Sequence, residues 1–309
     1  MVQASGLKKI IIIAGPTASG KTALSLKCAK ELDGEIIGCD SMQIYKGLNI
    51  GTGKIKPTEK CGIPHFMIDI IPPNGEFSVN DYVNMCDKVI GEICDRGKIP
   101  IIVGGTGLYM SGLLYGLDYA GAAKSEKVRN KYAAILKDKG KEYLFELLED
   151  IDYESSLKIN ANDTKRVIRA LEIYELTGRT KSQAAATCLK ARYDYLFIVL
   201  SPPRAALYKN INSRVDEMVA EELLDEVKSL YEFKDCQSMQ AIGYKEMIAY
   251  LDGYISFDDA VEQIKINTRH YAKRQLTYFK NMKANVRIAE DYDKSMDIGL
   301  IKECRKFLN

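Results

Sequence analysis

A glycine-rich octapeptide near the start of the chain has the residue types and spacing of a phosphate-binding loop. Residues 15–22 read GPTASGKT and match the pattern G-x-x-x-x-G-K-[ST] between an apolar segment and a helical one. In such a loop, glycines let successive backbone N–H groups turn toward a phosphate, a lysine adds a mobile positive charge, and a hydroxyl can bind Mg²⁺. The motif predicts binding of a diphosphate or polyphosphate, and leaves open whether phosphate is transferred. The candidate residues are Gly15, Pro16, Thr17, Ala18, Ser19, Gly20, Lys21 and Thr22, with Thr22 as the Mg²⁺ ligand.

A carboxylate and a second glycine-rich turn are expected close to this loop. Asp40 follows the apolar segment 35–39, and the turn 104–107 (GGTG) follows the apolar segment 99–103. Ligands of open α/β sheets bind at the carboxyl ends of the strands, so Asp40 would face the phosphate crevice. There it could bind a metal or act as a base, although a turn or helix-capping role fits its position equally well. The GGTG turn could add backbone N–H donors.

Two sets of cations lie in the C-terminal half. Arg214 has the carboxylates Asp216 and Glu217 beside it, which by itself favours a solvated salt bridge. The second set lies in the helical stretch around residues 265–283. When this stretch is projected down a helix axis, several cations fall within one sector of about 80°, and apolar side chains fall within another. No acid occurs between Gln263 and Arg287, so this basic stripe could follow a nucleic-acid backbone, and a solvated helix face is the alternative. The cations are Lys265, Arg269, Lys273, Lys280 and Lys283, and the apolar set is Ile264, Tyr271, Tyr278 and Met282.

These candidate residues need a parallel sheet to bring them together. Short apolar runs rich in β-branched residues predict buried strands at 8–14, 35–39, 99–103 and 195–200. A segment with helical periodicity comes after the first run, at 23–32, and another comes after the third run, at 108–114. Strands that alternate with helices imply right-handed βαβ units, and therefore an α/β fold with a P-loop NTPase-like parallel sheet.

The pattern of alternating strands and helices is interrupted once and then resumes. A charged, helix-favouring stretch without a convincing strand runs over residues 118–192 and predicts an inserted helical subdomain. We therefore divide the chain into the first part of a P-loop core (1–117), the insertion (118–192), and a return strand with C-terminal helices (193–309). The C-terminal helices are expected over 204–230 and 258–283.

Composition excludes several classes of protein. The chain has 309 residues, 46% of them hydrophobic and 28% charged, with a formal charge of +2, as in an ordinary globular protein. The apolar run 10–14 is far shorter than the roughly 20 residues of a membrane helix, and no secretory signal is visible, so we expect a cytoplasmic protein. Eight cysteines without a C-x-x-C pair, and two histidines, argue against a zinc site. The pattern requires no more than a monomer.

Taken together, the motifs identify a resemblance that covers nearly the whole chain. They are GPTASGKT (15–22), DSMQIYKGLNIGTGK (40–54), PHFMID (64–69), GGTGLY (104–109), NDTKRVIRALE (162–172), RVDEM (214–218), AIGYKE (241–246) and AKRQLTYF (272–279). In this order they resemble the bacterial tRNA dimethylallyltransferase family, also called tRNA isopentenyltransferase.

The resemblance implies transfer of a dimethylallyl group from dimethylallyl diphosphate to the N6 amine of adenosine 37 in tRNA, with release of diphosphate. It implies a P-loop core with a mobile helical insertion, and a channel that the two substrates enter from opposite ends. Asp40 would be the general base, and Thr17–Thr22, Arg214 and Mg²⁺ would hold the diphosphate. The residues implied to contact the tRNA anticodon stem-loop, together with two from the basic stripe, are Asp40, Ser41, Met42, Gln43, Thr106, Lys165, Arg166, Val167, Ile168, Arg169, Arg269 and Lys273.

The chain departs from the family pattern at three positions. Lys165 replaces the usual Gln, where a cation is compatible with a phosphate contact. Glu222 replaces a Gly that commonly follows the RVxxM helix, which is expected to remove a helix break. Tyr278 replaces the usual Trp and keeps an aromatic ring.

Three other functions are compatible with the P-loop. A cytokinin-type adenylate isopentenyltransferase would share Asp40, but it would need neither the insertion nor the basic C-terminal helix. A P-loop nucleotide kinase would leave the later motifs unexplained, and an RNA-binding P-loop ATPase would not modify its RNA. The sequence does not specify which tRNAs are substrates or whether the prenylated base is modified further.

Overall fold

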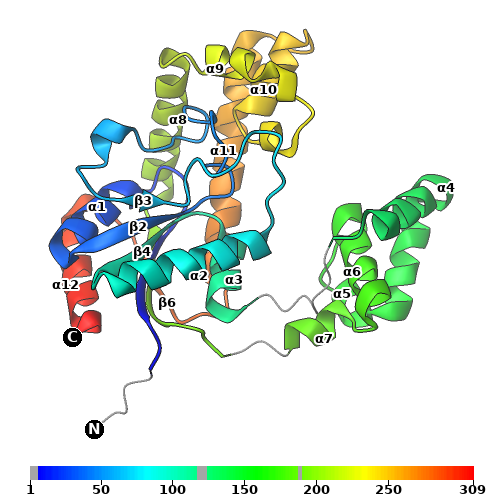
Figure 1. Ribbon diagram of the computed structural model, residues 1–309. Helices are drawn as coiled ribbons and strands as arrows, with labels where there is room; N and C mark the ends of the chain where they lie inside the picture. The colour runs from blue at the N-terminus through cyan, green and yellow to red at the C-terminus, as the bar shows by residue number, and fades with distance from the viewer. Residues whose placement is uncertain (1–5, 117–123, 187–189) are drawn as a thin grey trace. The chain divides into compact units, whose positions relative to one another are not determined.

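The computed structural model describes residues 6–116, 124–186 and 190–309 of the chain, and these fall into two compact units. The larger unit joins Met1–Leu114 to Arg192–Asn309, and the smaller unit is Tyr115–Ala191 (Figure 1). The chain divides within a few residues of the limits of the expected insertion, 118 and 192. Position 118 itself lies outside the described residues.

The larger unit is built on a six-stranded sheet in which every pairing is parallel. The strand order is β3-β2-β4-β1-β5-β6, with β4 between β1 and β2. The sheet therefore extends from β1 on both sides, through β4, β2 and β3 on one side and through β5 and β6 on the other. This topology confirms the predicted α/β class. The strands are β1 (Lys9–Ala14), β2 (Gly34–Cys39), β3 (His65–Phe66), β4 (Ile99–Gly104), β5 (Asp194–Ser201) and β6 (Val286–Glu290).

Four of these strands match predicted runs, and two were not predicted. β3 has two residues, which is too short to carry a pattern. β6 alternates half-buried and exposed residues up to the buried Ala289, because it lies at the edge of the sheet beside β5. Its sequence, VRIAE, lacks the continuous apolar run of a central strand.

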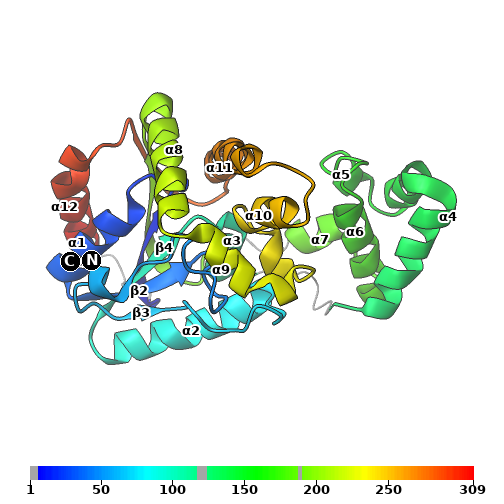
Figure 2. The ribbon, with the colours of Figure 1, turned by 90° about the horizontal axis from the view of Figure 1, so that it is seen from above.

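Helices cover the sheet and extend from it. Figure 2 shows α8 and α11 side by side, with α10 packed against α11. The helices outside the insertion are α1 (Lys21–Leu32), α2 (Val79–Asp95), α3 (Gly107–Tyr115), α8 (Arg204–Ala220), α9 (Leu223–Ser229), α10 (Tyr244–Leu251), α11 (Phe257–Lys280) and α12 (Asp297–Leu308), with 3-10 turns η1 (Pro57–Glu59), η2 (Tyr231–Phe233), η3 (Gln237–Gln240) and η4 (Lys294–Met296).

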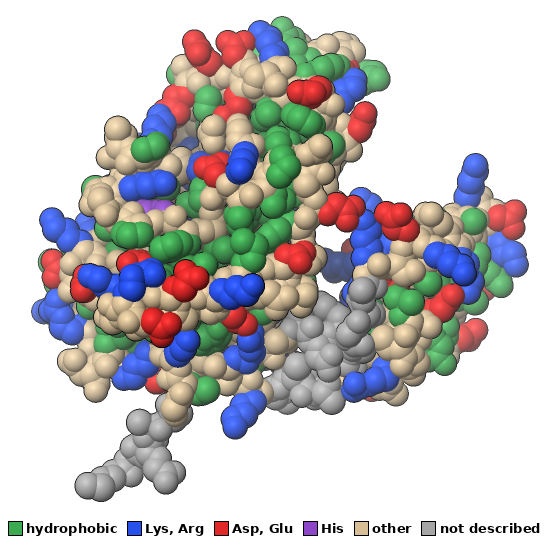
Figure 3. Space-filling model, in the orientation of Figure 1, with side chains coloured by type: hydrophobic (Ala, Val, Ile, Leu, Met, Phe, Trp, Pro, Cys, Tyr) green, Lys and Arg blue, Asp and Glu red, His purple; other side chains and the backbone are tan. Residues whose placement is uncertain are grey.

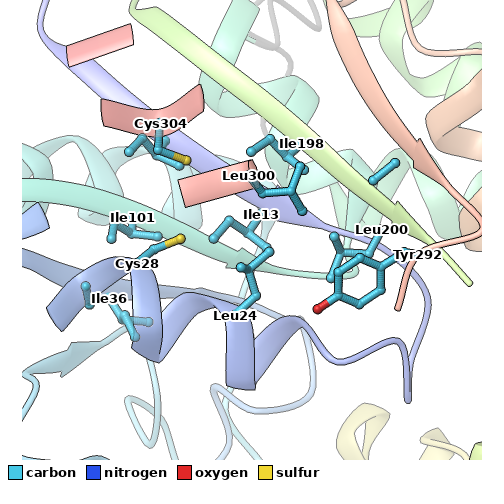
Figure 4. Close-up of a cluster of buried hydrophobic side chains, with 13 residues drawn as sticks. Ile13, Leu24, Cys28, Ile36, Ile101, Ile198, Leu200, Tyr292, Leu300 and Cys304 are labelled. Carbon is cyan, nitrogen blue, oxygen red and sulfur yellow. The ribbon is translucent and has the colours of Figure 1, made fainter. Parts of the chain in front are cut away.

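The core holds the P-loop helix firmly against the sheet. Ile11 and Ile13 on β1 pack in one buried cluster with Leu24 and Cys28 of α1 and with Cys304 of α12 (Figure 4). Burial of each such side chain contributes about 1.5–3 kcal/mol. On α2, the hydroxyl of buried Tyr82 donates to the Gly38 carbonyl at 3.1 Å. The start of α1 and the end of β2 are therefore both fixed by packing.

The smaller unit is helical and has its own core. It contains α4 (Glu126–Ile151), α5 (Tyr153–Ser156), α6 (Thr164–Thr177) and α7 (Lys181–Ala186). Val128, Leu144, Leu148 and Leu171 are buried together between α4 and α6. The unit also buries the carboxylate of Glu172, which accepts hydrogen bonds from Arg129, Arg169 and the Ser125 N–H.

The surface mixes charges of both signs. On the face in Figure 3, basic and acidic side chains are interspersed over the larger unit, as the small net charge of +2 implies. Each helix in the described part of the chain is too short or too polar to cross a lipid bilayer. The cysteines of the described residues are free thiols, and Cys188 lies outside those residues.

The helix break at Glu222 corrects a prediction. Replacement of the usual glycine was expected to remove the break, yet α8 ends at Ala220 and α9 begins at Leu223. Glu222 takes the left-handed conformation, with φ 70° and ψ 39°. Tertiary packing of buried Val215, Leu223 and Val227 in one cluster holds the bend despite the unfavourable residue.

Glu222→Gly should therefore stabilise the protein. A left-handed conformation costs a non-glycine residue roughly 1–2 kcal/mol, and glycine removes this cost. Part of the gain is offset because glycine has more conformational freedom in the unfolded chain. We expect the free energy of unfolding to rise by about 0.5–1 kcal/mol in urea denaturation followed by circular dichroism. The matched control is Lys209→Gly at an exposed position inside α8, which should lower it by about 1 kcal/mol. Destabilisation by both variants would contradict this account.

Candidate active site

Three loops leave the sheet at the same level. Gly104 at the end of β4 is in register with Ala14 of β1 on one side and with Cys39 of β2 on the other. The glycine-rich loop 15–20, the turn after Asp40 and the turn 104–107 therefore start side by side at the carboxyl edge. This is the crevice that the sequence predicted for a ligand.

The glycine-rich loop is shaped to receive an anion. It passes through left-handed conformations at Ala18 (φ 59°) and Gly20 (φ 91°) before α1 begins at Lys21. Ser19 is buried, and its hydroxyl is the one buried side-chain oxygen of the described residues that lacks a hydrogen-bond partner. An unsatisfied hydroxyl beside the N-terminus of a helix fits a bound phosphate group.

Two cations and Asp40 act on one another in this crevice. The Lys21 ammonium donates to the Pro16 carbonyl at 2.5 Å. Burial, followed by the nearby charge of Arg214, lowers the pKa of Lys21 to about 7, and the charge of Asp40 opposes this shift. Burial also lowers the pKa of Arg214, again against the pull of Asp40. The crevice thus holds two partly desolvated cations whose charges are opposed by Asp40, with Glu217 also acting on Arg214.

Asp40 forms a turn at the end of β2. Its Oδ1 accepts the Met42 N–H at 2.9 Å, as one of the sequence interpretations allowed. Within the described residues, this is its one hydrogen bond, so Oδ2 is available to a ligand. Ser41 is fixed in the same turn because its N–H donates to the Thr106 hydroxyl at 3.0 Å. A turn role and a chemical role are therefore compatible in Asp40.

Arg214 is not the solvated salt bridge that its neighbours suggested. Its guanidinium donates to the Gly53 carbonyl at 3.0 Å, and it makes no ion pair within the described residues. A Cβ on Gly53 would lie 1.5 Å from the guanidinium nitrogen, so this approach requires glycine. The side-chain amide of Gln43 donates to the Thr52 carbonyl at 3.1 Å, so Gln43 contacts the same loop as Arg214.

A half-buried carboxylate anchors that loop. Glu226 accepts the N–H groups of Asn49, Ile50 and Gly51 at distances from 2.9 to 3.2 Å. The hydroxyl of Tyr244 donates to the same carboxylate at 2.5 Å. Sequence reasoning did not select Glu226, because the backbone groups that it binds are more than 170 positions away along the chain.

Helix α11 completes the site with residues that the candidate set omitted. The side chain of Gln275 bridges the Thr17 N–H and the Gly105 carbonyl. Burial and the charge of Asp40 raise the pKa of Tyr271, while a hydrogen bond with Thr106 lowers it. The motif AKRQLTYF was visible in the sequence, but its glutamine carries no charge and does not belong to an apolar face, so neither pattern selected it.

The basic stripe on α11 differs from the prediction in three respects. Lys265 pairs with Asp216 at 2.7 Å, and Arg269 binds Asn212 and Glu262. Lys283 lies beyond the end of the helix at Lys280. Of the predicted apolar face, Ile264 is buried whereas Tyr278 is 40% exposed, because the helix docks through Ala260, Ile264, Ala272, Gln275 and Phe279.

Lys273 is an exposed cation, as the prediction of a basic stripe required. It is exposed and makes no ion pair within the described residues. Arg274, the next residue, is also exposed and stacks on Tyr271 with 5.7 Å to the ring centre.

The insertion residues named from the resemblance lie on α6. Lys165 and Arg166 are exposed, and Arg166 pairs with Asp163 at 3.2 Å. Val167 is buried in the core of the smaller unit, and Ile168 packs against that core, so neither can present a full side chain to a ligand. Arg169 is held by Glu172 at 2.6 Å.

The described residues contain no cluster of three or more His, Cys, Asp or Glu side chains able to hold a metal. Thr22 is exposed in the first turn of α1, and within that part of the chain its hydroxyl has no hydrogen-bond partner. A P-loop Mg²⁺ takes one protein hydroxyl together with phosphate oxygens and water, so Thr22 fits this role without an acidic cluster.

The chain is similar to known proteins over most of its length. The chain is 47% identical to the tRNA dimethylallyltransferase of Geobacillus thermodenitrificans over 277 residues, which cover 89% of this chain and 88% of that one. It is 42% identical to the full-length tRNA isopentenylpyrophosphate transferase of Bacillus halodurans, with a TM-score of 0.73 over 97% of each chain. A eukaryotic dimethylallyltransferase acting on tRNA is 32% identical, with a TM-score of 0.83 over 96% of this chain and 77% of that one.

The sequence model of one family, described as IPP transferase, matches residues 43–282. That span begins just after Met42, and it includes the GGTG turn, Arg214 and the whole of α11. The resemblance stated from the motifs is confirmed: the chain belongs to the IPP transferase family.

Proposed function

We propose that the protein transfers a dimethylallyl group from dimethylallyl diphosphate to the exocyclic N6 of adenosine 37 in tRNA and releases diphosphate. The observation that carries the proposal is the meeting of Lys21, Arg214 and Asp40 at one edge of the sheet. Two cations suit a leaving diphosphate, and the carboxylate suits an acceptor amine. The two bacterial relatives cited above are named a tRNA dimethylallyltransferase and a tRNA isopentenylpyrophosphate transferase.

Asp40 would act as the general base. The exocyclic amine of adenine is a weak nucleophile because its lone pair is delocalised into the ring. With Oδ1 fixed by the Met42 N–H, Oδ2 can orient the amine and accept its proton as the C–N bond forms. Such a base typically contributes about 10²- to 10⁴-fold to the rate.

The P-loop would bind the leaving group and not a phosphoryl donor. As the C–O bond to the allylic carbon breaks, negative charge grows on the diphosphate, and Lys21, Arg214 and the loop N–H groups stabilise it. The Thr17 N–H is already used by Gln275, so the cradle consists of residues 18–22. A Mg²⁺ ion on the Thr22 hydroxyl would neutralise part of the same charge.

The tRNA would bind through its anticodon stem-loop. Adenosine 37 must leave its stack to reach Asp40, at a cost of a few kcal/mol that is smaller in a loop than in a duplex. Lys273 and Arg274 on α11, and Lys165, Arg166 and Arg169 on α6, offer cations for the phosphate backbone. A tRNA substrate places the reaction in the cytoplasm.

Replacement of the proposed base gives the first test. Asp40→Asn keeps an oxygen for the Met42 N–H but cannot accept a proton at neutral pH. We expect prenylated adenosine, measured by mass spectrometry of nucleosides after single turnover with saturating substrates, to form about 10²- to 10⁴-fold more slowly. Binding of tRNA and of dimethylallyl diphosphate should change little.

The matched control is Asp33→Asn, since Asp33 lies at the opposite end of β2 and is exposed. It should retain the wild-type rate. Full activity of Asp40→Asn would exclude Asp40 as the base. If wild-type protein modified AMP but not tRNA, or transferred phosphate from ATP, the adenylate or kinase alternative would replace the proposal.

Diphosphate binding should depend on pH through Lys21. Because its pKa is lowered to about 7 in the free protein, Lys21 is mostly neutral at pH 8, and an anion that favours the charged form must draw in a proton. Affinity for dimethylallyl diphosphate should therefore fall as the pH rises above 7.

Calorimetry at pH 8 in two buffers of different ionisation enthalpy should reveal uptake of close to one proton per ligand. Lys21→Met should bind dimethylallyl diphosphate more weakly and without taking up that proton. Any proton taken up by the ligand itself is common to both proteins and cancels in the comparison. Equal proton uptake by the two proteins would rule out Lys21 as its source.

Lys273 should contribute to tRNA affinity by charge alone. Lys273→Glu removes one phosphate contact, so we expect weaker binding and a dependence of log K on log salt that is shallower by about one. Lys302→Glu on α12, another exposed lysine, makes the same change of charge as a control. Identical salt slopes for the two variants and the wild type, in filter-binding titrations, would remove Lys273 from the tRNA interface.

A further inference from the structure

The side chain of Gln275 joins two loops that are more than 80 residues apart in the sequence. It is 5% exposed on α11. Its Oε1 accepts the Thr17 N–H at 3.0 Å, and its Nε2 donates to the Gly105 carbonyl at 3.0 Å. A Cβ on Gly105 would lie 2.0 Å from Nε2, so the amide occupies the space that any other residue would fill.

Each of these loops holds one half of the proposed reaction. Thr17 belongs to the P-loop, which would bind the diphosphate. Gly105 precedes Thr106, whose hydroxyl accepts the Ser41 N–H directly after Asp40. A single buried amide therefore spans from the leaving-group site to the loop that fixes the base.

Neighbouring residues of α11 support the same contact. Tyr271, one turn earlier, is hydrogen-bonded to Thr106. Tyr278, one turn later, hydrogen-bonds Ser111 at 2.9 Å and lies against Gly107. Spacing of i, i+4 and i+7 puts these side chains on one face of the helix. That face is polar and rests on the turn 104–107, while Lys273 and Arg274 are exposed to solvent.

We infer that Gln275 is a positioning residue, which fixes the P-loop relative to Asp40 without touching either substrate. This role rests on the proposed function. Each loop keeps its own internal hydrogen bonds, so each should still bind its substrate when the bridge is lost. The relative placement of the two reactants then loosens, and a misplacement of about 1 Å can cost roughly 10²-fold in rate.

The test separates the rate of transfer from binding. Gln275→Met has nearly the same shape but makes neither hydrogen bond. We expect its single-turnover rate of prenylation, at saturating tRNA and dimethylallyl diphosphate, to fall by about 10²-fold. Both dissociation constants should stay within about threefold of the wild type, which is an outcome that general loss of structure would not give. Gln263→Met, at an exposed position on the same helix, should behave as wild type.

A second route to the same contact guards against misfolding of one variant. Gly105→Ala should displace the amide and slow transfer in the wild-type background. In a Gln275→Ala background the added methyl group meets the Gly15 carbonyl oxygen at 3.4 Å, which is an ordinary contact, so Gly105→Ala should cost little more. Additive losses in this cycle would mean that the two residues act separately.

The possible failures are distinguishable. Absence of prenylated tRNA with wild-type protein would refute the proposed function. Prenylation by the wild type, with an undiminished rate in Gln275→Met or with a loss confined to the dissociation constants, would refute only the positioning role.

Discussion

The register of three parallel strands at Gly104 is the constraint on which the site depends. Because Gly104 pairs with Ala14 and with Cys39, the loops after β1, β2 and β4 begin at one level. A parallel sheet then directs all three to the same edge, and no strand has to be distorted to bring Asp40 near Lys21. A register shift of one residue at β2 would turn the buried Cys39 outward and displace Asp40 with it.

Charge balance explains why this edge suits an anionic ligand. Lys21 and Arg214 are both partly desolvated, and Asp40 acts on both of them, while Glu217 adds to its effect on Arg214. Burial of two like charges is unfavourable, which is why the pKa of Lys21 falls to about 7. In the proposed reaction, a bound diphosphate would offset this cost. Arg214 is fixed beforehand by Gly53, and that loop is fixed by Glu226, so little reorganisation is needed as charge develops.

Local patterns were sufficient for the four central strands of the sheet and for the residues that follow them at its edge. The runs before Gly15, Asp40 and Gly104 are continuous and apolar, and strands buried on both faces require that. The remainder depends on contacts between distant segments. The two residues of β3 are too few to show the periodicity of a strand. The helix break at Glu222 is maintained by tertiary packing, although glutamate is unfavourable in the left-handed conformation. The face by which α11 docks was misassigned because it includes a buried polar residue, Gln275, which an apolar stripe cannot reveal.

The long-range tethers also explain how the core can carry a separate helical unit. Each contact that shapes the site, from Arg214, Glu226 or Gln275, joins residues of the larger unit. Where the chain leaves and re-enters that unit, the Arg192 N–H donates to the Leu114 carbonyl at 2.8 Å. The Arg192 guanidinium also reaches the carboxylate of Asp87 on α2. The two connections are thereby held together against a helix of the larger unit, so the chain can leave and re-enter that unit without using any of the contacts that shape the site.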